Sequence, residues 1–350
     1  MKLVLLALTS FAFFALPVRA AQQSAAPVAC KSAATPIDEK GFVDIGGIDQ
    51  WITIKGSRCG NPVILFLHGG PGNPNSPFAA SMYASWEKDF TIVQWDQRGA
   101  GMTFGKNKPA EEDRLTIEQM RDDGLAVAAY LQQHLGKRKV ILMGSSWSSI
   151  LGVYMIKARP ELFYAYVGSS HIVSSRENQA TTYTRLLAMA REAGDKDSVA
   201  KLEAAGTPPW VNPRNSGIVR RVVYKYEAMH SDPSPKTWAM APEYATPKAQ
   251  ADYEGGEDYS YIQFVGMKGD GMYAGVDLPK LGTTFAVPFY MVQGEADLLT
   301  LPDVSRRYFD SIQAPRKEFV SVPRAGHDPN QAMLDAQYRI LKERVDPRLD

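Results

Sequence analysis

The stretch Lys139-Val-Ile-Leu-Met-Gly-Ser-Ser-Trp-Ser-Ser-Ile-Leu-Gly152 decides the fold. A short apolar run ends at Gly144, Ser146 follows, and small residues then open a segment of helical character. This is the strand, sharp turn and helix of a nucleophile elbow, G-x-S-x-G, in which Ser148 takes the place of the last glycine. Strand and helix nearly touch at such a turn, so small residues must flank the nucleophile. We expect the hydroxyl of Ser146 to stand above the end of a sheet, where a general base reaches it.

Strand-like and helical segments alternate on both sides of this elbow. Most of the strand-like segments are continuous apolar runs, which indicates strands buried on both faces and hence a parallel sheet. The first two alternate instead, as in an antiparallel hairpin. Strands are expected at residues 42–45, 50–55, 62–67, 90–95, 139–143, 163–167, 287–292 and 318–322, and helices at 77–88, 116–135, 148–158, 302–312 and 330–345. The pattern predicts a wound α/β sheet.

The regular alternation stops between residues 174 and 284. This part is helical at first, at 181–193 and 217–229, and then becomes rich in tyrosine, glycine and acidic residues. We interpret 174–284 as a cap inserted between two strands of a core formed by residues 41–173 and 285–350. Ligands of doubly wound sheets bind beyond the carboxyl ends of the strands, so a cap at that edge roofs the site.

The chain begins with a pattern typical of a secretory signal peptide. A charged start precedes an apolar run at residues 3–16 and small residues up to Ala20, so we expect residues 1–20 to be removed. The alternative is a membrane anchor, but the run is shorter than the ~20 apolar residues of a spanning helix. The sequence therefore predicts an exported protein, periplasmic or secreted, that is free of the membrane after cleavage and has a mobile segment at 21–40.

Cysteine usage and charge narrow the class of protein further. The chain has 2 cysteines, Cys30 and Cys59, and export to an oxidising compartment favours a disulfide between them over two free thiols. Lys and Arg number 39 against 38 Asp and Glu, and no basic stripe suggests a nucleic-acid partner. The sequence does not set the oligomeric state.

A serine nucleophile requires a base, and the chain has 5 histidines. His327 is the expected base, because it directly follows the last strand-like run. His134 ends a predicted helix and is expected to be structural. His230 lies in the predicted cap and His68 in a glycine-rich loop, whereas His171 follows a strand beside the elbow and is expected to line the pocket.

The orienting acid should come from another strand end, between the serine and the histidine. Asp297 is the first choice and Glu295 the second, since both follow the apolar run at residues 287–292. Either carboxylate can instead be a solvated turn residue. The order Ser146, Asp297, His327 favours the first choice, because it is the order of the α/β-hydrolase triad.

A third element, the oxyanion hole, is expected at His68-Gly-Gly-Pro-Gly72, directly after the strand at residues 62–67. Glycines let backbone N–H groups approach a substrate oxygen without obstruction. The expected donors are the N–H groups of Trp147 and of Gly69 or Gly70. The loop lacks the G-K-[ST] ending of a phosphate-binding loop.

These residues, together with the segment 95–101, resemble the proline iminopeptidase family of α/β-hydrolases. The matching segments are His68–Gly72, Trp95-Asp-Gln-Arg-Gly-Ala-Gly101, Gly144-Ser-Ser-Trp-Ser-Ser149, Gly294-Glu-Ala-Asp297 and Gly326-His327. The resemblance covers residues 40–170 and 285–345. It implies a mostly parallel, eight-stranded core with helices on both faces, a largely helical cap and an acyl-enzyme mechanism.

The chain departs from this family in two places. Met102-Thr103 replaces the usual Arg-Ser, and the cap matches poorly. Cap glutamates hold the substrate amino group in the family, and the resemblance makes Glu227 a substrate-binding candidate, with Glu254 and Glu257 as alternatives. Each of these carboxylates can equally be solvated.

Together the motifs predict a serine hydrolase that needs no metal or organic cofactor. The first expected substrate is a short peptide or amino-acid amide with a free N-terminus. The alternative is an ester or lactone of a small carboxylic acid, because a fold does not fix a function. A third hypothesis is a non-catalytic binding protein on a hydrolase scaffold.

Overall fold

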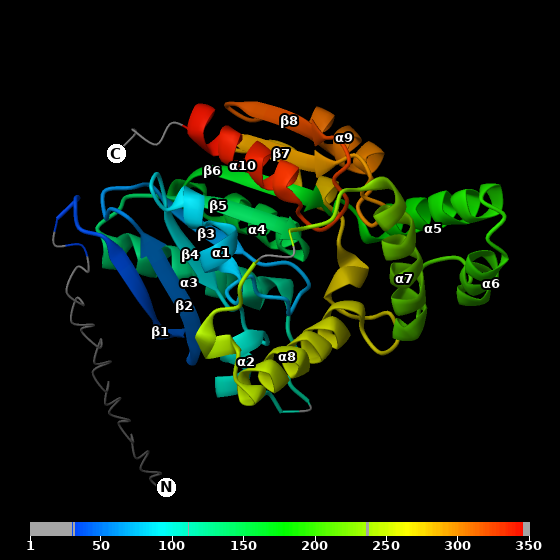
Figure 1. Cartoon of the computed structure of the whole chain (residues 1–350), viewed down its shortest axis with the longest axis horizontal. Coiled ribbons are helices and arrows are strands. Elements are labelled where there is room, and N and C mark those ends of the chain that lie inside the picture. Colours follow the sequence, from blue (N-terminus) through cyan, green and yellow to red (C-terminus); the bar gives the residue numbers. More distant parts are fainter. Residues whose placement is uncertain (1–29, 31, 111, 236–237, 346–350) are drawn as a thin grey trace, which may run out of the picture.

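In the computed structural model, residues 30, 32–110, 112–235 and 238–345 are described, and they form an α/β fold around one sheet of eight strands (Figure 1). The spatial order is β1-β2-β4-β3-β5-β6-β7-β8. The β1–β2 and β2–β4 pairs are antiparallel, and all other pairs are parallel. This confirms the predicted mostly parallel sheet. The strands are β1 Ile37–Ile45, β2 Ile48–Gly56, β3 Val63–Leu67, β4 Thr91–Trp95, β5 Val140–Ser146, β6 Phe163–His171, β7 Phe289–Gly294 and β8 Lys317–Val322.

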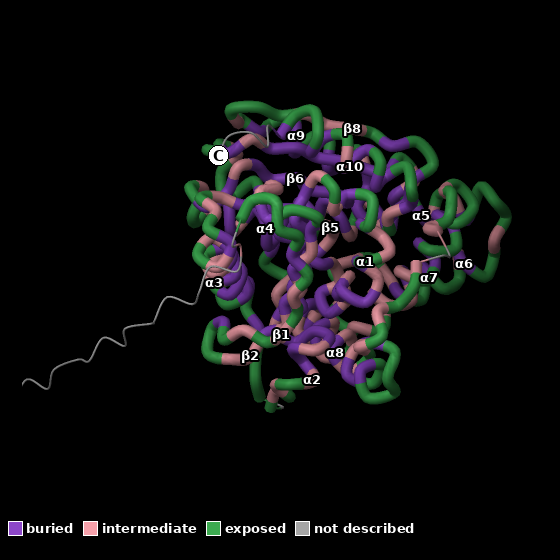
Figure 2. The backbone as a smooth tube through the Cα atoms, turned by 60° about the vertical axis from the view of Figure 1, so that its left-hand side comes forward, coloured by how far each residue is buried: buried purple, intermediate pink, exposed green. Residues whose placement is uncertain are grey.

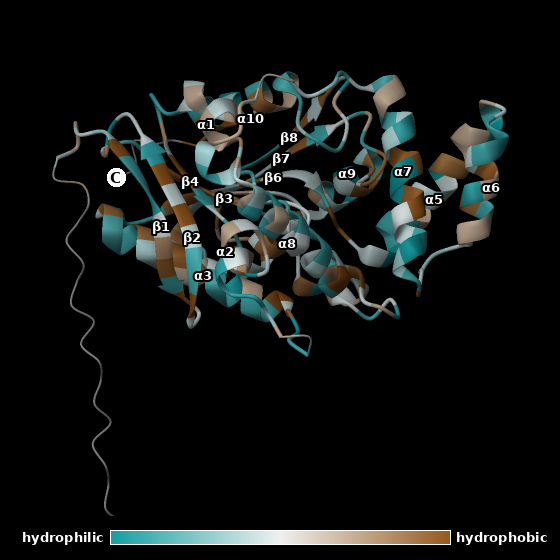
Figure 3. Ribbon diagram, turned by 60° about the horizontal axis from the view of Figure 1, so that its bottom comes forward, coloured by the Kyte–Doolittle hydropathy of each residue, from teal (hydrophilic) through white to brown (hydrophobic). Residues whose placement is uncertain are grey.

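The position of each strand follows its apolar pattern. Every residue of β3, β4 and β7 is buried, because helices cover both faces of the sheet there. The outer strands β1 and β2 alternate between buried and accessible positions, as one-sided strands do. Figure 3 shows the same alternation as a change of hydropathy along β2.

Two layers of core helices enclose the sheet. Helices α3, α4 and α9 share one apolar cluster with it, and α1, the short turn η1 and α10 share another on the opposite face. Their bounds are α1 Ala79–Met82, η1 Ala84–Trp86, α3 Ile117–Leu135, α4 Trp147–Ala158, α9 Pro302–Ser311 and α10 Gln331–Glu343. Thr116 caps the start of α3, because its hydroxyl accepts from the N–H of Gln119, and Gly136, which is left-handed with φ 64°, caps its end. Helix α2 (Gly101–Lys106) was not among the helices predicted from the sequence.

A helical insert separates β6 from β7. Its first three helices, α5 (Ser175–Glu192), α6 (Lys196–Ala205) and α7 (Pro213–His230), pack on one another around a small apolar cluster of their own. They project beyond the end of the sheet (Figure 1), and α6 is largely exposed (Figure 2). The insert therefore places α7 over the carboxyl ends of the strands.

The last helix of the insert, α8 (Pro247–Val265), lies instead against the core. Its Ser260 hydroxyl donates to the carbonyl of Gly99 at 2.7 Å, and a Cβ on Gly256 would lie 3.1 Å from the same oxygen. The aromatic and acidic stretch noted in the sequence is thus part of a helix. Short 3-10 turns, η3 (Pro242–Tyr244), η4 (Met272–Gly275) and η5 (Leu278–Leu281), complete the insert.

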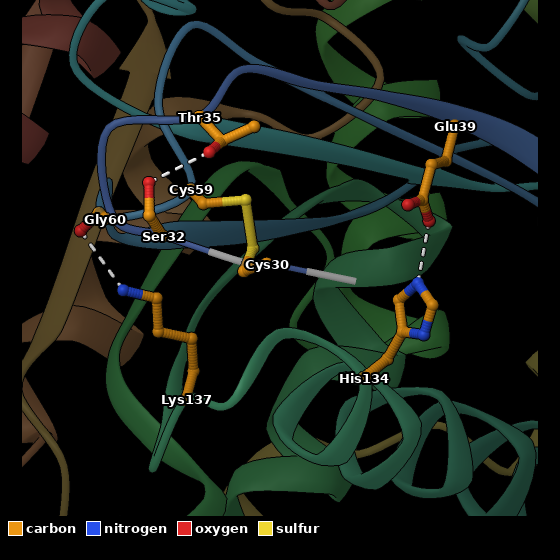
Figure 4. The surroundings of a disulfide bond; sticks show 8 residues. All are labelled: Cys30, Ser32, Thr35, Glu39, Cys59, Gly60, His134 and Lys137. Atoms are coloured by element: carbon orange, nitrogen blue, oxygen red, sulfur yellow. Dashed lines mark hydrogen bonds and ion pairs between the residues drawn. A yellow bond between two sulfur atoms is a disulfide. The ribbon is translucent and has the colours of Figure 1, made fainter. Parts of the chain in front are cut away.

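The start of the core differs from the expected boundary. Residues 37–40, assigned to a mobile segment at 21–40, belong to β1, because Ile37 is buried and pairs with Gly56. Cys30 and Cys59 form the predicted disulfide (Figure 4), and Lys137 donates nearby to the carbonyl of Gly60 at 3.1 Å. The predicted signal peptide, 1–20, lies outside the described residues. Within those residues, no helix is both long and apolar enough to cross a membrane.

Candidate active site

The turn between β5 and α4 has the geometry expected of a nucleophile elbow. Ser146 is the last residue of β5 and adopts φ 55°, ψ −123°, a conformation that L-residues rarely hold without support from their surroundings. A Cβ on Gly144 would lie 2.5 Å from the carbonyl oxygen of Ser148, so the crossing of strand and helix requires glycine there. The turn leaves Ser146 at the wall of two cavities.

The serine that replaces the last elbow glycine is integrated into the turn. The Ser148 side chain is fully buried, and its hydroxyl donates to the carbonyl of Leu67 at 2.5 Å. The same oxygen accepts from the N–H of Ser145 at 2.9 Å. The substitution therefore ties the elbow to the end of β3, next to the glycine-rich loop.

Three predicted residues meet at the carboxyl edge of the sheet. The Nε2 atom of His327 lies 2.9 Å from the hydroxyl oxygen of Ser146, and its Nδ1 atom lies 3.2 Å from both carboxylate oxygens of Asp297. They come from the ends of β5, β7 and β8. Glu295, the second choice for the acid, is exposed and accepts from the hydroxyl of Ser321 at 2.9 Å. The geometry thus favours Asp297 as the partner of the imidazole.

Asp297 is fully buried and held by several donors. Its carboxylate accepts from the backbone N–H groups of Leu299 and Thr300 at 2.9 and 2.7 Å, and from the Thr300 hydroxyl at 2.5 Å. The side-chain amide of Gln293 donates at 2.9 Å. Burial acts to raise the pKa of Asp297, but the charge of His327 and these hydrogen bonds outweigh it and hold the pKa below its ordinary value. Gln293 and Thr300 were missed in the sequence; the spacing of Thr300, three residues after the acid, is the signal that would have found it.

The imidazole of His327 is equally enclosed. Burial acts to lower its pKa, yet the charge and hydrogen bond of Asp297 raise the pKa to about 9. The hydroxyl of Ser170 donates to the carbonyl oxygen of His327 at 2.8 Å. The ring is therefore fixed between the acid and the serine.

The glycine-rich loop after β3 packs directly on the elbow. A Cβ on Gly69 would lie 3.6 Å from the Cβ of Ser146, so glycine allows the backbone of the loop to come close to the serine. His68 anchors the loop, because its Nδ1 donates to the Gly69 carbonyl at 2.9 Å and its Nε2 accepts from the N–H of Gln97 at 3.1 Å. The side chain of Gln97 then accepts from the indole of Trp147 at 3.1 Å. The expected oxyanion residues thus share one hydrogen-bonded frame.

The remaining residues of the Trp95–Gly101 motif stabilise the surroundings of this frame. Asp96 is fully buried and accepts from the hydroxyls of Ser76 and Tyr244 at 2.5 and 2.7 Å. Burial raises the pKa of Asp96 to about 6. Arg98 donates to Asp123 at 2.8 Å. These contacts assign the motif a structural role beside the site.

Two cavities open at Ser146. The first, here called the oxyanion-side cavity, has a volume of about 130 Å³ and is lined by Gly69, Gly70, His327 and Arg220, among others. The second, here called the apolar cavity, has a volume of about 100 Å³. Its hydrophobic lining residues are Ile172, Trp210, Val219, Phe264, Val265 and Leu299, and polar residues that include Asn178, Gln179 and Arg220 complete the wall. A substrate with its scissile carbonyl at Ser146 can extend one group into each.

Of the predicted substrate-binding glutamates, Glu227 lies beneath the catalytic loops. It is buried, and its carboxylate accepts from the N–H of Leu298 at 2.6 Å and from the N–H of His327 at 3.3 Å. Burial and the charge of Asp297 raise its pKa to about 7. Both oxygens are engaged by backbone, so the structure corrects the expectation of a substrate ligand: Glu227 joins the loops that carry Asp297 and His327.

The other two glutamates lie on α8. Glu254 is exposed and faces solvent, whereas Glu257 is half-buried and accepts from the amide of Asn73 at 3.1 Å. Glu257 lines an outer groove together with Gly70 and Arg220, next to the oxyanion-side cavity. The structure therefore separates Glu254 from the site and leaves Glu257 at its rim.

His171 is the second correction. Its side chain is fully buried among the rings of Tyr166, Phe289 and Tyr308 and lines neither cavity at Ser146. Burial lowers its pKa to about 4. A β-strand side chain beside the elbow can point into the core or the site, and here it points into the core.

His134 lies away from the site, and its Nε2 atom is 2.7 Å from a carboxylate oxygen of Glu39 (Figure 4). Among the described residues, no cluster of three or more His, Cys, Asp or Glu is arranged to hold a metal ion.

Comparisons with known proteins agree with this geometry. A family model described as alpha/beta hydrolase fold matches residues 62–330. A probable aminopeptidase, YbaC, of Bacillus subtilis (strain 168) is 27% identical over 297 residues, which cover 82% of this chain and 90% of the relative. A probable proline iminopeptidase of Streptomyces coelicolor is 25% identical over 314 residues, covering 83% of this chain and 90% of the relative.

Solved structures show the same fold. The crystal structure of VinJ superposes with a TM-score of 0.65 at 19% identity, covering 88% of this chain and 98% of that one. The proline iminopeptidase of Mycobacterium smegmatis superposes with a TM-score of 0.59 at 20% identity, covering 88% and 93%. At such identities the likeness concerns the fold.

Proposed function

The chain belongs to the α/β-hydrolase family, and from this premise we propose that it is a serine hydrolase with Ser146 as nucleophile, His327 as general base and Asp297 as orienting acid. The observation that carries the proposal is the contact series Ser146 Oγ–His327 Nε2–Asp297, with 2.9 Å at the first contact and 3.2 Å at the second. This series supplies a nucleophile, a base in hydrogen-bond reach and a third group that orients the base.

The reaction follows from these positions. Ser146 Oγ attacks the substrate carbonyl carbon while His327 Nε2 takes its proton. The backbone N–H groups of Trp147 and of Gly69 or Gly70 stabilise the negative oxygen of the tetrahedral intermediate. His327 returns the proton to the leaving amine or alcohol, which departs and leaves an ester on Ser146. Water, deprotonated by the same imidazole, then releases the acid and restores the serine.

We further propose that the substrates are short peptides cleaved after their first residue. The two relatives named as probable aminopeptidase and probable proline iminopeptidase support this choice, since each matches more than four-fifths of the chain. A free α-amino group is a cation at neutral pH and binds best beside a carboxylate. Glu257, at the rim of the oxyanion-side cavity and bonded to Asn73, is the proposed partner of that cation.

The test compares aminoacyl naphthylamides with their N-acetylated forms. We expect acetylation to lower kcat/KM by roughly 10- to 100-fold, because charge-assisted hydrogen bonds contribute ~1.5–3 kcal/mol. Glu257→Gln should cause a similar loss on free substrates only, and Glu254→Gln on the exposed face of α8 should cause none. Equal cleavage of free and acetylated substrates would exclude the aminopeptidase. A fluorophosphonate label that reacts with the protein but not with Ser146→Ala tests the nucleophile itself.

The apolar cavity supports one alternative, an esterase or lactonase of small carboxylic acids. Hydrophobic residues form one part of the wall of this cavity, and no Asp or Glu among the described residues lines it, so an uncharged acyl group can pack against that part. Under this alternative, nitrophenyl esters of short acids would be cleaved faster than any naphthylamide. Their rates would also be indifferent to the charge at residue 257.

We also propose that the protein is exported. The charged and apolar start of the chain supports this, and so does the Cys30–Cys59 disulfide, since such bonds persist in oxidising compartments. Mass spectrometry of protein recovered from the exported fraction should give an N-terminus at Ala21. Recovery of chains that retain Met1, with both thiols reduced, would contradict export.

A further inference from the structure

Arg220 on α7 is the cation that faces both cavities at Ser146. It is half-buried and lines the oxyanion-side cavity as well as the apolar cavity. Its Nε atom donates to the hydroxyl of Tyr224 at 2.9 Å, one turn further along the helix. Among the described residues no carboxylate lies within 4.0 Å of its guanidinium, although Asp328 and Glu257 are near enough for their charges to act on it. A guanidinium has five N–H donors, so this residue retains capacity for a ligand.

A second side chain at the apolar cavity, Asn178, has a donor without a partner among the described residues. Asn178 is buried, and its side-chain oxygen accepts from the N–H groups of both Val173 and Ser174 at 3.0 Å. These two bonds fix which end of the amide is the oxygen, so Nδ2 points away from them. Within the part of the chain that the structure describes, Nδ2 has no hydrogen-bond partner. A buried donor without a partner is unfavourable and calls for an acceptor on a bound molecule.

The size of the cavities limits what that molecule is. The volumes are about 130 and 100 Å³, whereas an apolar cavity of about 150 Å³ holds one benzene molecule. Each cavity therefore accommodates one small side chain beside the scissile carbonyl, whereas a ring such as naphthyl would extend into the outer groove that shares Gly70 and Arg220 with the oxyanion-side cavity. Arg220 lines both cavities, so an anionic group carried by a residue next to the scissile bond would enter a cavity that Arg220 borders.

We propose that Arg220 binds a carboxylate of the substrate and makes the site selective for very small amides or esters that carry a free carboxyl group, foremost dipeptides. This rests on the proposed function and specifies its substrate class. Planar guanidinium and carboxylate groups form paired hydrogen bonds, which lysine does not reproduce. The carboxylate belongs either to the leaving group, as in a dipeptide, or to the acyl group, as in a monoester of a dicarboxylic acid.

The test uses matched substrate pairs that differ only in this charge. The first pair is Ala-Ala and its C-terminal amide, and the second is the monophenyl ester of glutaric acid and phenyl valerate, with uncatalysed hydrolysis subtracted. We expect kcat/KM to favour the charged member of at least one pair by roughly 10- to 100-fold, the range of a charge-assisted hydrogen bond. The pair that responds identifies the side of the scissile bond that carries the carboxylate.

Arg220→Met should bring that ratio close to one, and Arg220→Lys should retain only part of it. The control is Arg221→Met, which removes the same charge from the adjacent exposed position, lining neither cavity, and should preserve the ratio. A ratio near one in the unmodified protein, or one that survives Arg220→Met, would overturn the inference.

A binding measurement separates this inference from the proposed function. Calorimetric titration of glutarate into Ser146→Ala should show binding, and titration into Ser146→Ala/Arg220→Met should show at least tenfold weaker binding. Arg220-dependent binding without hydrolysis of any substrate would refute the hydrolase and retain the carboxylate site. Hydrolysis without Arg220-dependent binding or preference would do the opposite.

Discussion

The site has two sides that differ in how their polar groups are used. The floor is formed by the strand ends that carry Ser146, Asp297 and His327, and the roof is formed by helix α7 of the insert. On the floor, the carboxylate of Asp297 accepts from the side chains of Gln293, Thr300 and His327, and backbone donors supplement them. On the roof, Arg220 lines two cavities and donates to Tyr224, its one hydrogen-bond partner among the described residues. Because the carboxylate of Asp297 is held by several donors, the catalytic side chains are fixed in one geometry, as formation of a covalent bond requires. The remaining N–H donors of Arg220 on the roof can bind a ligand. This difference assigns catalysis to the floor and substrate selection to the roof.

Helix α7 joins the two regions. Arg220 and Glu227 are seven residues apart, about two turns of helix, and so lie on the same side of α7. Arg220 reaches the cavities, whereas Glu227 reaches the backbone of the loops that carry Asp297 and His327. One helix of the insert therefore contacts both substrate space and catalytic loops, which distinguishes it from α6, exposed over most of its length.

The largest effect should come from the floor itself. Asp297→Asn should lower kcat on the order of 10⁴-fold, because the amide leaves His327 without its counter-charge and permits the wrong tautomer. The control is Glu295→Gln, which alters the exposed carboxylate two residues earlier and should leave kcat unchanged. Steady-state rates on a common ester substrate measure both. A collapse in Glu295→Gln with activity retained in Asp297→Asn would reverse the assignment of the acid.

The floor was predictable from the sequence because short-range constraints define it. Continuous apolar runs indicated the buried strands, and every predicted run became one of the strands. The small residues around Ser146 and the glycines after β3 reflect contacts at fixed distances, such as that between Gly144 and the Ser148 carbonyl. The chain order of serine, acid and histidine then limited the choices. Gln293 and Thr300, the hydrogen-bond partners of Asp297, were not predicted, because polar residues at or near a strand end are common and do not by themselves indicate a site.

The roof was less predictable because its residues act over long sequence distances. Glu227 contacts the N–H of His327, 100 positions away, and nothing in its local sequence indicates that contact. Most buried positions of α6 and α8 hold small or polar residues, such as Ser198, Gly256 and Ser260, so neither helix shows a clear apolar pattern in the sequence. His171 was expected after a strand and is the last residue of β6. Packing alone decides that its ring contacts Tyr166 and does not face the site.

The second prediction concerns the joint between roof and floor. Glu227→Gln should lower kcat on the order of tenfold and the free energy of unfolding by about 1–3 kcal/mol, because the amide cannot accept from both N–H groups and leaves a buried donor unpaired. Glu227→Asp keeps the charge but not the reach, so it should lower kcat as well. Chemical denaturation and steady-state kinetics measure the two quantities.

The pH profile separates the charge of Glu227 from its reach. Activity requires the neutral imidazole, so it should rise with pH, with a midpoint above the ordinary ~6.5 because Asp297 raises the pKa of His327 to about 9. The Glu227 charge also raises that pKa, so Glu227→Gln should move the midpoint to lower pH. Glu227→Asp should leave the midpoint in place. An unmoved midpoint in Glu227→Gln would confine Glu227 to a packing role.

A smaller effect is expected from the serine that departs from the family pattern. Ser148→Ala removes the hydroxyl that links Leu67 and Ser145, so it should lower the free energy of unfolding by about 1–3 kcal/mol and kcat by only a few-fold. The matched variant is Ser149→Ala, in which the neighbouring buried hydroxyl is removed; that hydroxyl donates to the Ser146 carbonyl at 2.6 Å. The free energy of unfolding and kcat of the two variants are compared. Loss of fluorophosphonate labelling in Ser148→Ala, with labelling retained in Ser146→Ala, would shift the nucleophile by two positions.

The smallest effect on turnover should come from the disulfide, which lies at the opposite edge of the sheet. Cys59 precedes β3 and Ser146 ends β5; these strands are parallel, so the bond and the hydroxyl lie at opposite ends of them. The bond closes a loop between positions 29 apart, so its removal should lower the free energy of unfolding by ~2–4 kcal/mol. Cys30→Ala/Cys59→Ala should thus melt at a lower temperature than the parent and show the same kcat/KM below its transition. Alkylation of both cysteines in the unreduced parent would disprove the bond, and a loss of kcat/KM in the folded variant would show that the two edges are coupled.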